Sequence, residues 1–260
     1  SEQTSLSVSV PEDMVLVPAG DFQMGSDNEK ANDREKPAHT VYVDAFYMDK
    51  YPVTNEQYKA FVEANQQWGK QPSNWGKQNR IKKRMLSIFE KYRGVGYLKH
   101  WNGNEFPIAK ADHPVTHVSW YASMAYAKWV GKRLPTEAEW EKAARGGLTG
   151  QKYPWGDILD SNMVYCGKDV GETTSVGKYP ANNYGLHDIV GNVWEWCLDE
   201  HDEDFYSASS VRNPVAGANT KEDLNLLIHD FRNVSTDRVL RGGSLFTSSE
   251  PVQTSVRCSG

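Results

Sequence analysis

The segment from Asp188 to Glu195 contains the residue types that a hard cation needs. Asp188 and Glu195 carry carboxylates, and Gly191 lies between them, where the backbone can bend and present carbonyl oxygens. Calcium ions take about six to eight oxygen ligands of these two kinds. An Asx turn with a capping acid and no ion explains the same spacing, and from spacing alone it is the favoured interpretation. The residues themselves leave both interpretations open.

Sulfur and imidazole groups show no comparable pattern. The chain has three cysteines, Cys166, Cys197 and Cys258, which allows one disulfide with a leftover thiol, or three free thiols. The histidines lack the close spacing of zinc or iron ligand sets, and we interpret each as a turn or surface residue. They are His39, His100, His113, His117, His187, His201 and His229.

Composition limits the class of function. The net charge of -5 argues against nucleic-acid binding, which usually needs a basic surplus. One basic stretch, residues 77–99, is either a solvated face or a docking patch for an acidic partner. No apolar run reaches the roughly 20 residues that cross a bilayer, so we predict no membrane span. The compartment stays open, with a secreted or periplasmic location preferred over a cytoplasmic one, and we expect a monomer.

The elements that must position these residues are short. Apolar and alternating runs predict strands at 14–18, 21–25, 39–48 and 238–241, and Thr54, Ser119 and Thr136 each predict the start of a helix. The stretch 66–111 is irregular, with a basic amphipathic helix from Ile81 to Tyr92, and 202–236 is a long loop with one short helix. We predict a tail at 1–13 and a single α+β domain at 14–260, with much irregular structure.

Seven segments, in the same order along the chain, resemble the motifs of the formylglycine-generating enzyme (sulfatase-modifying factor) family. Each is a weak signal alone, but together they extend from residue 14 to residue 244. The segments are MVLVPAG with FQMG (14–25), YPVTNEQY (51–58), HPVTHVSW (113–120), KRLPTEAEWEKAARGG (132–147), YPWGD (153–157), NYGLHDIVGNVWEW (183–196) and LRGGS (240–244).

The resemblance implies a fold and two metal sites. The fold would be C-type-lectin-like, with low regular secondary structure, long loops and bound calcium. In the first calcium site, Asp188 and Glu195 would give side-chain oxygens, while Gly191 and Val193 would give backbone carbonyls. The second site would lie just upstream, and its candidate ligands are Asn162, Met163, Asp169 and the carbonyl of Val170 or Gly171.

The same resemblance shows what this chain lacks. Active members hold copper(I) on two cysteines a few residues after the serine of the last motif, because this soft ion prefers sulfur. Here Thr247 stands at the first position, and Val252, or Gln253 with a shift of one residue, stands at the second. We therefore expect no copper. The iron-dependent relatives take their ligands from an additional helical domain, for which the sequence shows no pattern. Family members also close with a further strand, which we expect this chain to lack.

Trp194 and Ser244 match positions that line the active groove in catalytic members, which makes them groove candidates together with Thr247. Core packing explains Trp194 equally, and a turn hydroxyl explains Ser244. We interpret Arg241 as a buried partner of an acid. Three functions follow: a divergent oxidase-like member, a non-catalytic C-type-lectin-like module that binds a peptide, protein or small molecule, and a paralogue that associates with an active member or a sulfatase.

Overall fold

The computed structural model describes residues 10–70, 90–167, 171–247 and 252–260. Some of the predictions fall wholly or largely outside these ranges. They are the helix from Ile81 to Tyr92, most of the tail at 1–13, and the candidate calcium ligands Asp169 and Val170.

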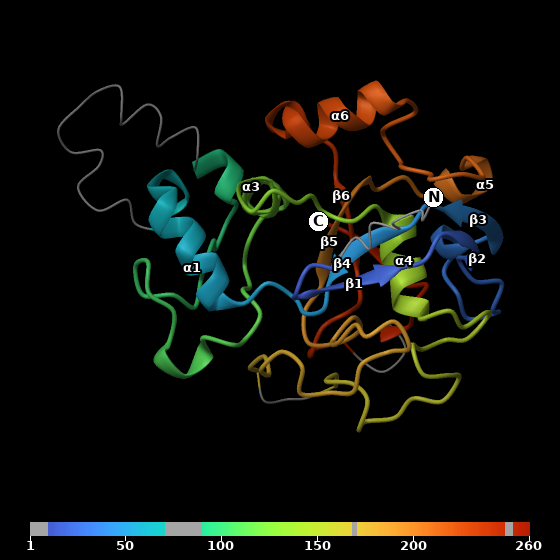
Figure 1. Ribbon diagram of the computed structural model, residues 1–260, viewed down its shortest axis with the longest axis horizontal. Coiled ribbons are helices and arrows are strands. Elements are labelled where there is room, and N and C mark those ends of the chain that lie inside the picture. The colour runs from blue at the N-terminus through green and yellow to red at the C-terminus, as the bar shows by residue number, and fades with distance from the viewer. Residues whose placement is uncertain (1–9, 71–89, 168–170, 248–251) are drawn as a thin grey trace, which may run out of the picture.

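The first half of the chain forms two small antiparallel sheets (Figure 1). Strand β1 (Met14–Val17) pairs with β4 (Phe46–Asp49), and β2 (Gly20–Met24) pairs with β3 (His39–Val43). The segment 39–48, predicted as one strand, is therefore two strands. Pro18 lies between β1 and β2 and has no N–H to donate, so the ladder is interrupted there and the opposite chain changes partner at Asp44 and Ala45.

A three-stranded antiparallel sheet follows later in the chain. Its order is β5 (Glu195–Glu200), β6 (Arg238–Arg241) and β7 (Arg257–Ser259). The sequence predicted only the central strand. Strand β5 escaped prediction because Cys197, Leu198 and Asp199 are buried in succession, so the strand lacks the alternating pattern of a half-exposed strand.

Helices begin where the capping residues predicted. Thr54, Ser119 and Thr136 accept hydrogen bonds from the first turns of α1 (Asn55–Ala64), α3 (Trp120–Trp129) and α4 (Glu137–Arg145). The predicted long loop contains α5 (Phe205–Ala208) and α6 (Lys221–His229), the latter on the outside of the molecule (Figure 1). Single 3₁₀ turns lie at Asp33–Glu35, Gln66–Trp68, Ile108–Lys110 and Phe231–Asn233.

Helix α4 is buried along its whole length and carries charged side chains into the core. Arg241, which is fully buried, contacts Glu137 at 2.9 Å and Glu141 at 2.5 Å, and Arg257 contacts Glu137 at 2.9 Å. The prediction that Arg241 is a buried partner of an acid is confirmed. Because each charge has opposite charges beside it, the network avoids the large cost of isolated buried charges.

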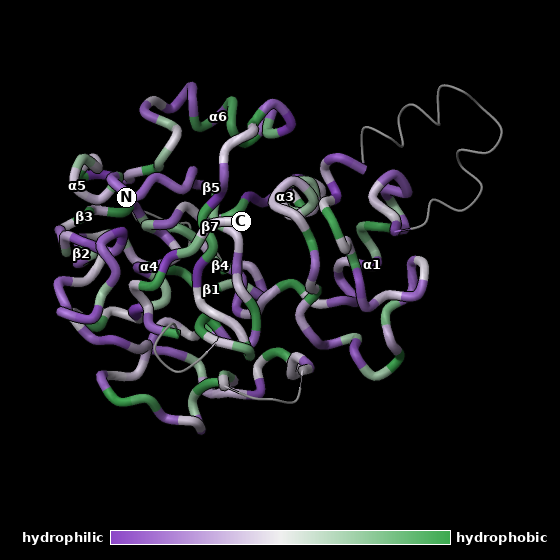
Figure 2. Tube along the Cα trace, turned by 180° about the vertical axis from the view of Figure 1, so that it is seen from behind, coloured by the Kyte–Doolittle hydropathy of each residue, from purple (hydrophilic) through white to green (hydrophobic). Residues whose placement is uncertain are grey.

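The apolar part of this core lies beside α4. It includes Val17, Trp140, Leu186, Cys197 and Val239, all shielded from solvent. In Figure 2 hydrophobic stretches of the trace run through the middle of the molecule near α4 and β4, and others lie in α6 and in outer loops, among hydrophilic stretches. Mixed helices and small sheets with much irregular chain confirm the predicted fold class.

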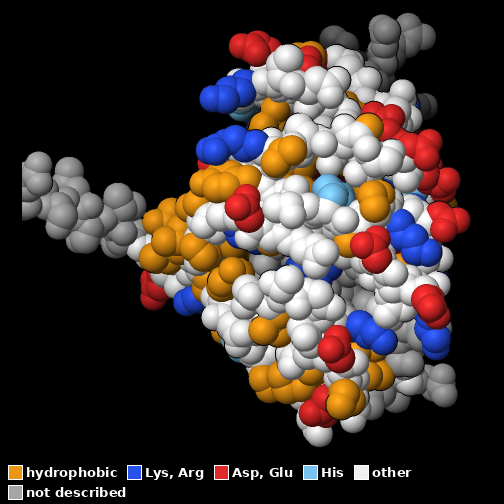
Figure 3. Space-filling view, turned by 90° about the vertical axis from the view of Figure 1, so that its right-hand side faces the viewer, with side chains coloured by type: hydrophobic (Ala, Val, Ile, Leu, Met, Phe, Trp, Pro, Cys, Tyr) orange, Lys and Arg blue, Asp and Glu red, His pale blue; other side chains and the backbone are white. Residues whose placement is uncertain are grey.

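A second hydrophobic cluster joins α1 and α3. Tyr58, Phe61, Trp68 and Trp101 pack together, and the polar ends of the buried aromatic rings find partners: the Tyr58 and Tyr97 hydroxyls are 2.9 Å apart. None of the described helices has the length and apolar character that crossing a bilayer requires. On the face shown in Figure 3, acidic and basic side chains are interspersed, and hydrophobic side chains gather toward one edge.

Candidate functional site

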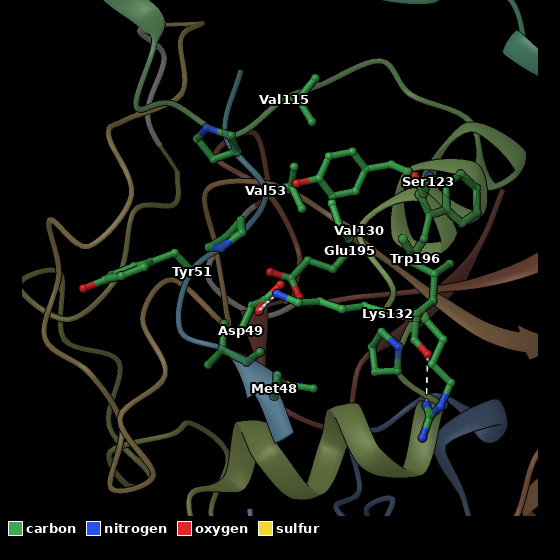
Figure 4. Close-up of a pocket in the computed structure, with 18 of the residues that line it drawn as sticks. Met48, Asp49, Tyr51, Val53, Val115, Ser123, Val130, Lys132, Glu195 and Trp196 are labelled. Carbon is green, nitrogen blue, oxygen red and sulfur yellow. Dashed lines mark hydrogen bonds and ion pairs between the residues drawn. The ribbon is translucent and has the colours of Figure 1, made fainter. Parts of the chain in front are cut away.

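A cavity of about 400 Å³ lies between β4, α3 and the chain that leads into β5. Its walls are mainly aliphatic and aromatic, and Tyr126 and Trp196 are among the rings. Trp196 is labelled in Figure 4. The aliphatic lining comes from Val53, Val115, Val118, Val130 and Ile189. A concave, mostly apolar site with few polar groups is the usual form of a ligand pocket.

Charged groups line this cavity as well. Lys132 contacts Asp49 at 2.5 Å, and each of these side chains is a little more than one third exposed, at 38% and 37%. Glu195 points into the same space from the start of β5 (Figure 4). The indole N–H of Trp140 donates to the Glu195 carboxyl at 2.8 Å. Burial, with a smaller contribution from Asp188, raises the pKa of Glu195 to about 7.

The segment that leads into β5 is tightly constrained. Asp188 has a φ of 54°, in the left-handed region, and its carboxylate accepts a hydrogen bond from the Gly177 N–H at 2.6 Å. Gly191 has a φ of 80°, and a Cβ there would lie 2.6 Å from a methyl group of Val164, so no other residue fits without a shift. Sequence reasoning identified Gly191 as the point of bending, and the backbone does bend there.

Asp188 and Glu195 fit a cation chemically. Asp188 is buried and Glu195 is half-buried. Burial raises the pKa of each carboxyl, and the charge of Asp188 also raises the pKa of Glu195. Within the described part of the chain, neither carboxylate forms an ion pair. The same ranges contain no group of three or more His, Cys, Asp and Glu side chains that could hold a metal, so an ion at this segment would need backbone carbonyls such as those of Gly191 and Val193.

The candidate residues of the second calcium site lie in two places. The N–H groups of Asn162 and Met163 are bonded to the side chain and carbonyl of Asp160, at 2.8 and 3.0 Å. Met163 lines a smaller cavity, of about 230 Å³, together with Asp188. Gly171 is exposed and lines neither of these two cavities. The structure therefore describes only part of this candidate ligand set.

The three groove candidates are not in one cavity. Trp194 lines the large cavity, whereas Ser244 and Thr247 form a turn of their own. The Thr247 N–H donates to the Ser244 carbonyl at 3.0 Å, and the Thr247 hydroxyl accepts from the Ser244 N–H at 2.8 Å. Val252 is completely buried. The threonine hydroxyl is thus used inside the turn, which agrees with the turn interpretation of Ser244.

The three cysteines lie on different elements: Cys197 in β5, Cys258 in β7 and Cys166 outside the strands and helices. No disulfide joins Cys166, Cys197 and Cys258, which settles the alternative left open by the sequence. Cys197 is fully buried, and burial raises the pKa of its thiol well above the usual range. A thiol in that state is a poor metal ligand or nucleophile.

Several lining residues were missed by sequence reasoning. Asp49, Tyr126 and Lys132 come from β4, α3 and the loop before α4, and each looks like an ordinary surface or helix residue in its own segment. Burial also raises the pKa of Tyr126 to about 12, with a contribution from Asp49. The only available signal was that Lys132 opens the longest of the recognised motifs.

The fold and the constrained Asp188–Glu195 segment define a class of irregular α+β domain, and comparison with known proteins identifies the family. The model of the sulfatase-modifying factor enzyme 1-like domain matches residues 3–259, so the chain belongs to that family. The formylglycine-generating enzyme of Bos taurus is 34% identical over 265 residues, which cover 91% of this chain and 66% of that protein.

Two further relatives and one solved structure are also similar to this chain. The inactive C-alpha-formylglycine-generating enzyme 2 of Bos taurus is 37% identical over 219 residues, or 72% of this chain and 71% of that protein. The serine/threonine-protein kinase pkn1 of Chlamydia caviae is 40% identical over 198 residues, but the match spans only 29% of its length. PvdO from Pseudomonas aeruginosa shares the fold, with a TM-score of 0.67 at 20% identity, over 97% of this chain and 90% of that one.

Proposed function

We propose that this chain is a calcium-stabilised binding domain of the sulfatase-modifying factor family, without the copper-dependent oxidation of cysteine. The cavity of about 400 Å³ is the observation that carries the proposal, because it offers apolar walls and a few charged groups to a peptide or small-molecule ligand. The residues at the copper positions support it. Thr247 and Val252 have no thiolate to offer, and hydroxyl or aliphatic groups do not bind copper(I).

The similar proteins include a formylglycine-generating enzyme and an inactive counterpart, and both are compatible with this proposal. The chain is about equally identical to a formylglycine-generating enzyme and to a protein described as its inactive counterpart, at 34% and 37%. Family membership therefore does not decide the activity, and the residues at the site must decide it.

Calcium is assigned to the Asp188–Glu195 segment. Asp188 and Glu195 would hold the ion with their side chains, and Gly191 and Val193 with their carbonyls. The ion would neutralise a buried acid, Asp188, and a half-buried one, Glu195, neither of which has an ion pair in the described structure. It would thereby hold the segment that leads into β5 and into the cavity wall. The same proposal includes a second ion at Asn162, Met163, Asp169 and Gly171.

A copper titration followed by an activity assay tests the proposal that the chain does not carry out copper-dependent oxidation of cysteine. The reduced protein is loaded with copper(I), then given oxygen and a peptide with a C-x-P-x-R sulfatase motif, and the product is measured by mass spectrometry. We expect no tight copper binding and no aldehyde. Conversion of the cysteine would overturn the proposal and favour the divergent oxidase instead.

A dye-binding measurement tests the cavity. We expect 1-anilinonaphthalene-8-sulfonate to fluoresce on the folded protein, and Val115→Phe to remove most of this signal because the larger ring occupies the cavity. Val95→Phe, at a fully exposed position, is the matched control. Equal fluorescence from Val115→Phe and the unaltered protein would show that the dye binds elsewhere and that the cavity does not accept ligands.

A further inference from the structure

Two histidines that are 17 positions apart in the sequence meet at the surface. The Nε2 atoms of His100 and His117 are 3.1 Å apart, and their ring centroids are 4.9 Å apart at an angle of 62°. Neither Nε2 atom has any other hydrogen-bond partner among the described residues. Both side chains are exposed, so an ion can reach them from solvent.

The backbone holds this pair rigidly. His117 has a φ of 56° and Leu98 a φ of 48°. Two non-glycine residues that contact each other therefore both adopt the left-handed conformation. The Leu98 N–H donates to the His117 carbonyl at 2.9 Å, and Leu98 is completely buried. Such conformations cost free energy and persist only where the surrounding structure imposes them.

Buried groups anchor both sides of the pair. Trp101 follows His100, is buried, and donates its indole N–H to Asn55 at 3.0 Å. Ser119 lies two residues after His117 and caps helix α3. Little conformational entropy therefore remains to be lost when the two imidazoles bind one ion, which favours binding.

We propose that His100 and His117 form a site for a divalent transition-metal ion, with zinc or copper(II) as the class that imidazole prefers. Two protein ligands leave the remaining coordination positions to water or to a small-molecule ligand. The site differs in chemistry from the oxygen-rich Asp188–Glu195 segment. Calcium is a hard ion that takes oxygen ligands, whereas zinc and copper(II) bind imidazole nitrogen. It does not depend on the proposed binding function.

Isothermal titration of the calcium-loaded protein with zinc chloride tests this site, and a spectrum of the histidine side-chain nitrogens reports where the ion binds. We expect one zinc ion per chain and a shift of the Nε2 signals of two histidines. His100→Ala and His117→Asn should each weaken zinc binding by more than about tenfold, since even residues that only orient ligands cost 10–100-fold. Asparagine is chosen because it tolerates the left-handed backbone at position 117.

The control is His229→Ala, which removes an exposed histidine in the last turn of α6 and should leave zinc binding unchanged. Equal melting temperatures would show that the variants remain folded. Zinc binding that survives both His100→Ala and His117→Asn, or shifts confined to other histidines, would overturn the proposal. Absence of zinc binding to the folded, unaltered protein would overturn it as well and would leave the pair as a hydrogen-bonded contact between two rings.

Discussion

At the scale of single residues, buried acids are the most informative feature of this domain. Asp188 and Glu195 are proposed to hold calcium, but Asp199 has a different environment. Its two oxygens accept the N–H groups of Glu137 and Ala216, at 2.7 and 3.0 Å. Asp199 thus connects β5 to the start of α4, and burial, followed by the charge of Glu137, raises its pKa to about 7.

This pKa predicts a pH dependence of stability. An unfolded aspartate titrates near pH 4, so between pH 4 and 7 the folded protein keeps a proton that the unfolded chain has lost. The free energy of unfolding should therefore fall as pH rises from about 4 to about 7 and level off above pH 7, with a decrease of roughly 1–3 kcal/mol between pH 5 and pH 8 from this group. Asp199→Asn stays neutral and should flatten the decrease, as measured by urea unfolding at pH 5 and pH 8.

The control for this experiment is Asp13→Asn, at an exposed position in front of β1. It should leave the pH dependence as it is. An Asp199→Asn protein whose stability falls as steeply between pH 5 and pH 8 as that of the unaltered protein would show that other groups cause the decrease.

At the scale of elements, α4 lies at the centre of the core, since all nine of its residues are buried. Thr136 caps it by accepting the Glu139 N–H at 3.1 Å, and Glu139 returns a bond to the Thr136 N–H at 2.9 Å. This reciprocal arrangement satisfies two donors that the helix itself leaves without partners.

Thr136→Ala should lower the free energy of unfolding by about 1 kcal/mol, because the hydroxyl acceptor is lost while little apolar surface changes. Urea denaturation measures this loss. Thr136→Ser keeps a hydroxyl at the cap and should recover most of it. If the serine variant were as unstable as the alanine variant, the threonine methyl group, and not the capping bond, would account for the effect.

At the scale of the whole molecule, calcium is expected to stabilise the fold. An ion that binds the folded chain only, at a concentration about 100 times its dissociation constant, adds about 2.7 kcal/mol. In a protein of this size such a gain raises the melting temperature by roughly 5–10 °C. Thermal unfolding with calcium and with a chelator measures the difference, and magnesium should substitute poorly because it demands a smaller, octahedral site.

Glu195→Gln should distinguish the stability that calcium adds from the stability of the calcium-free fold. With calcium present, this variant should lose most of the stabilisation. Without calcium it should be as stable as the parent protein or more so at neutral pH, because it removes the cost of a buried charge. An unaltered response to calcium would place the ion elsewhere.

The sequence alone determined much of this protein. Ordered motifs gave the family, and Thr54, Ser119 and Thr136 gave the helix starts. Thr247 and Val252, at positions where the resemblance places cysteines, led to the prediction that copper does not bind. These features are local, since a cap or a turn depends on residues within a few positions of one another.

Only the tertiary structure decided which distant side chains meet. It divided 39–48 into two strands, placed Trp194 in a cavity apart from Ser244, and brought His100 to His117. Each of these outcomes depends on long-range packing, around α4 for the strands and around the α1–α3 cluster for the histidine pair. A sequence pattern reports spacing along the chain, and it does not report which loops the packed core holds side by side.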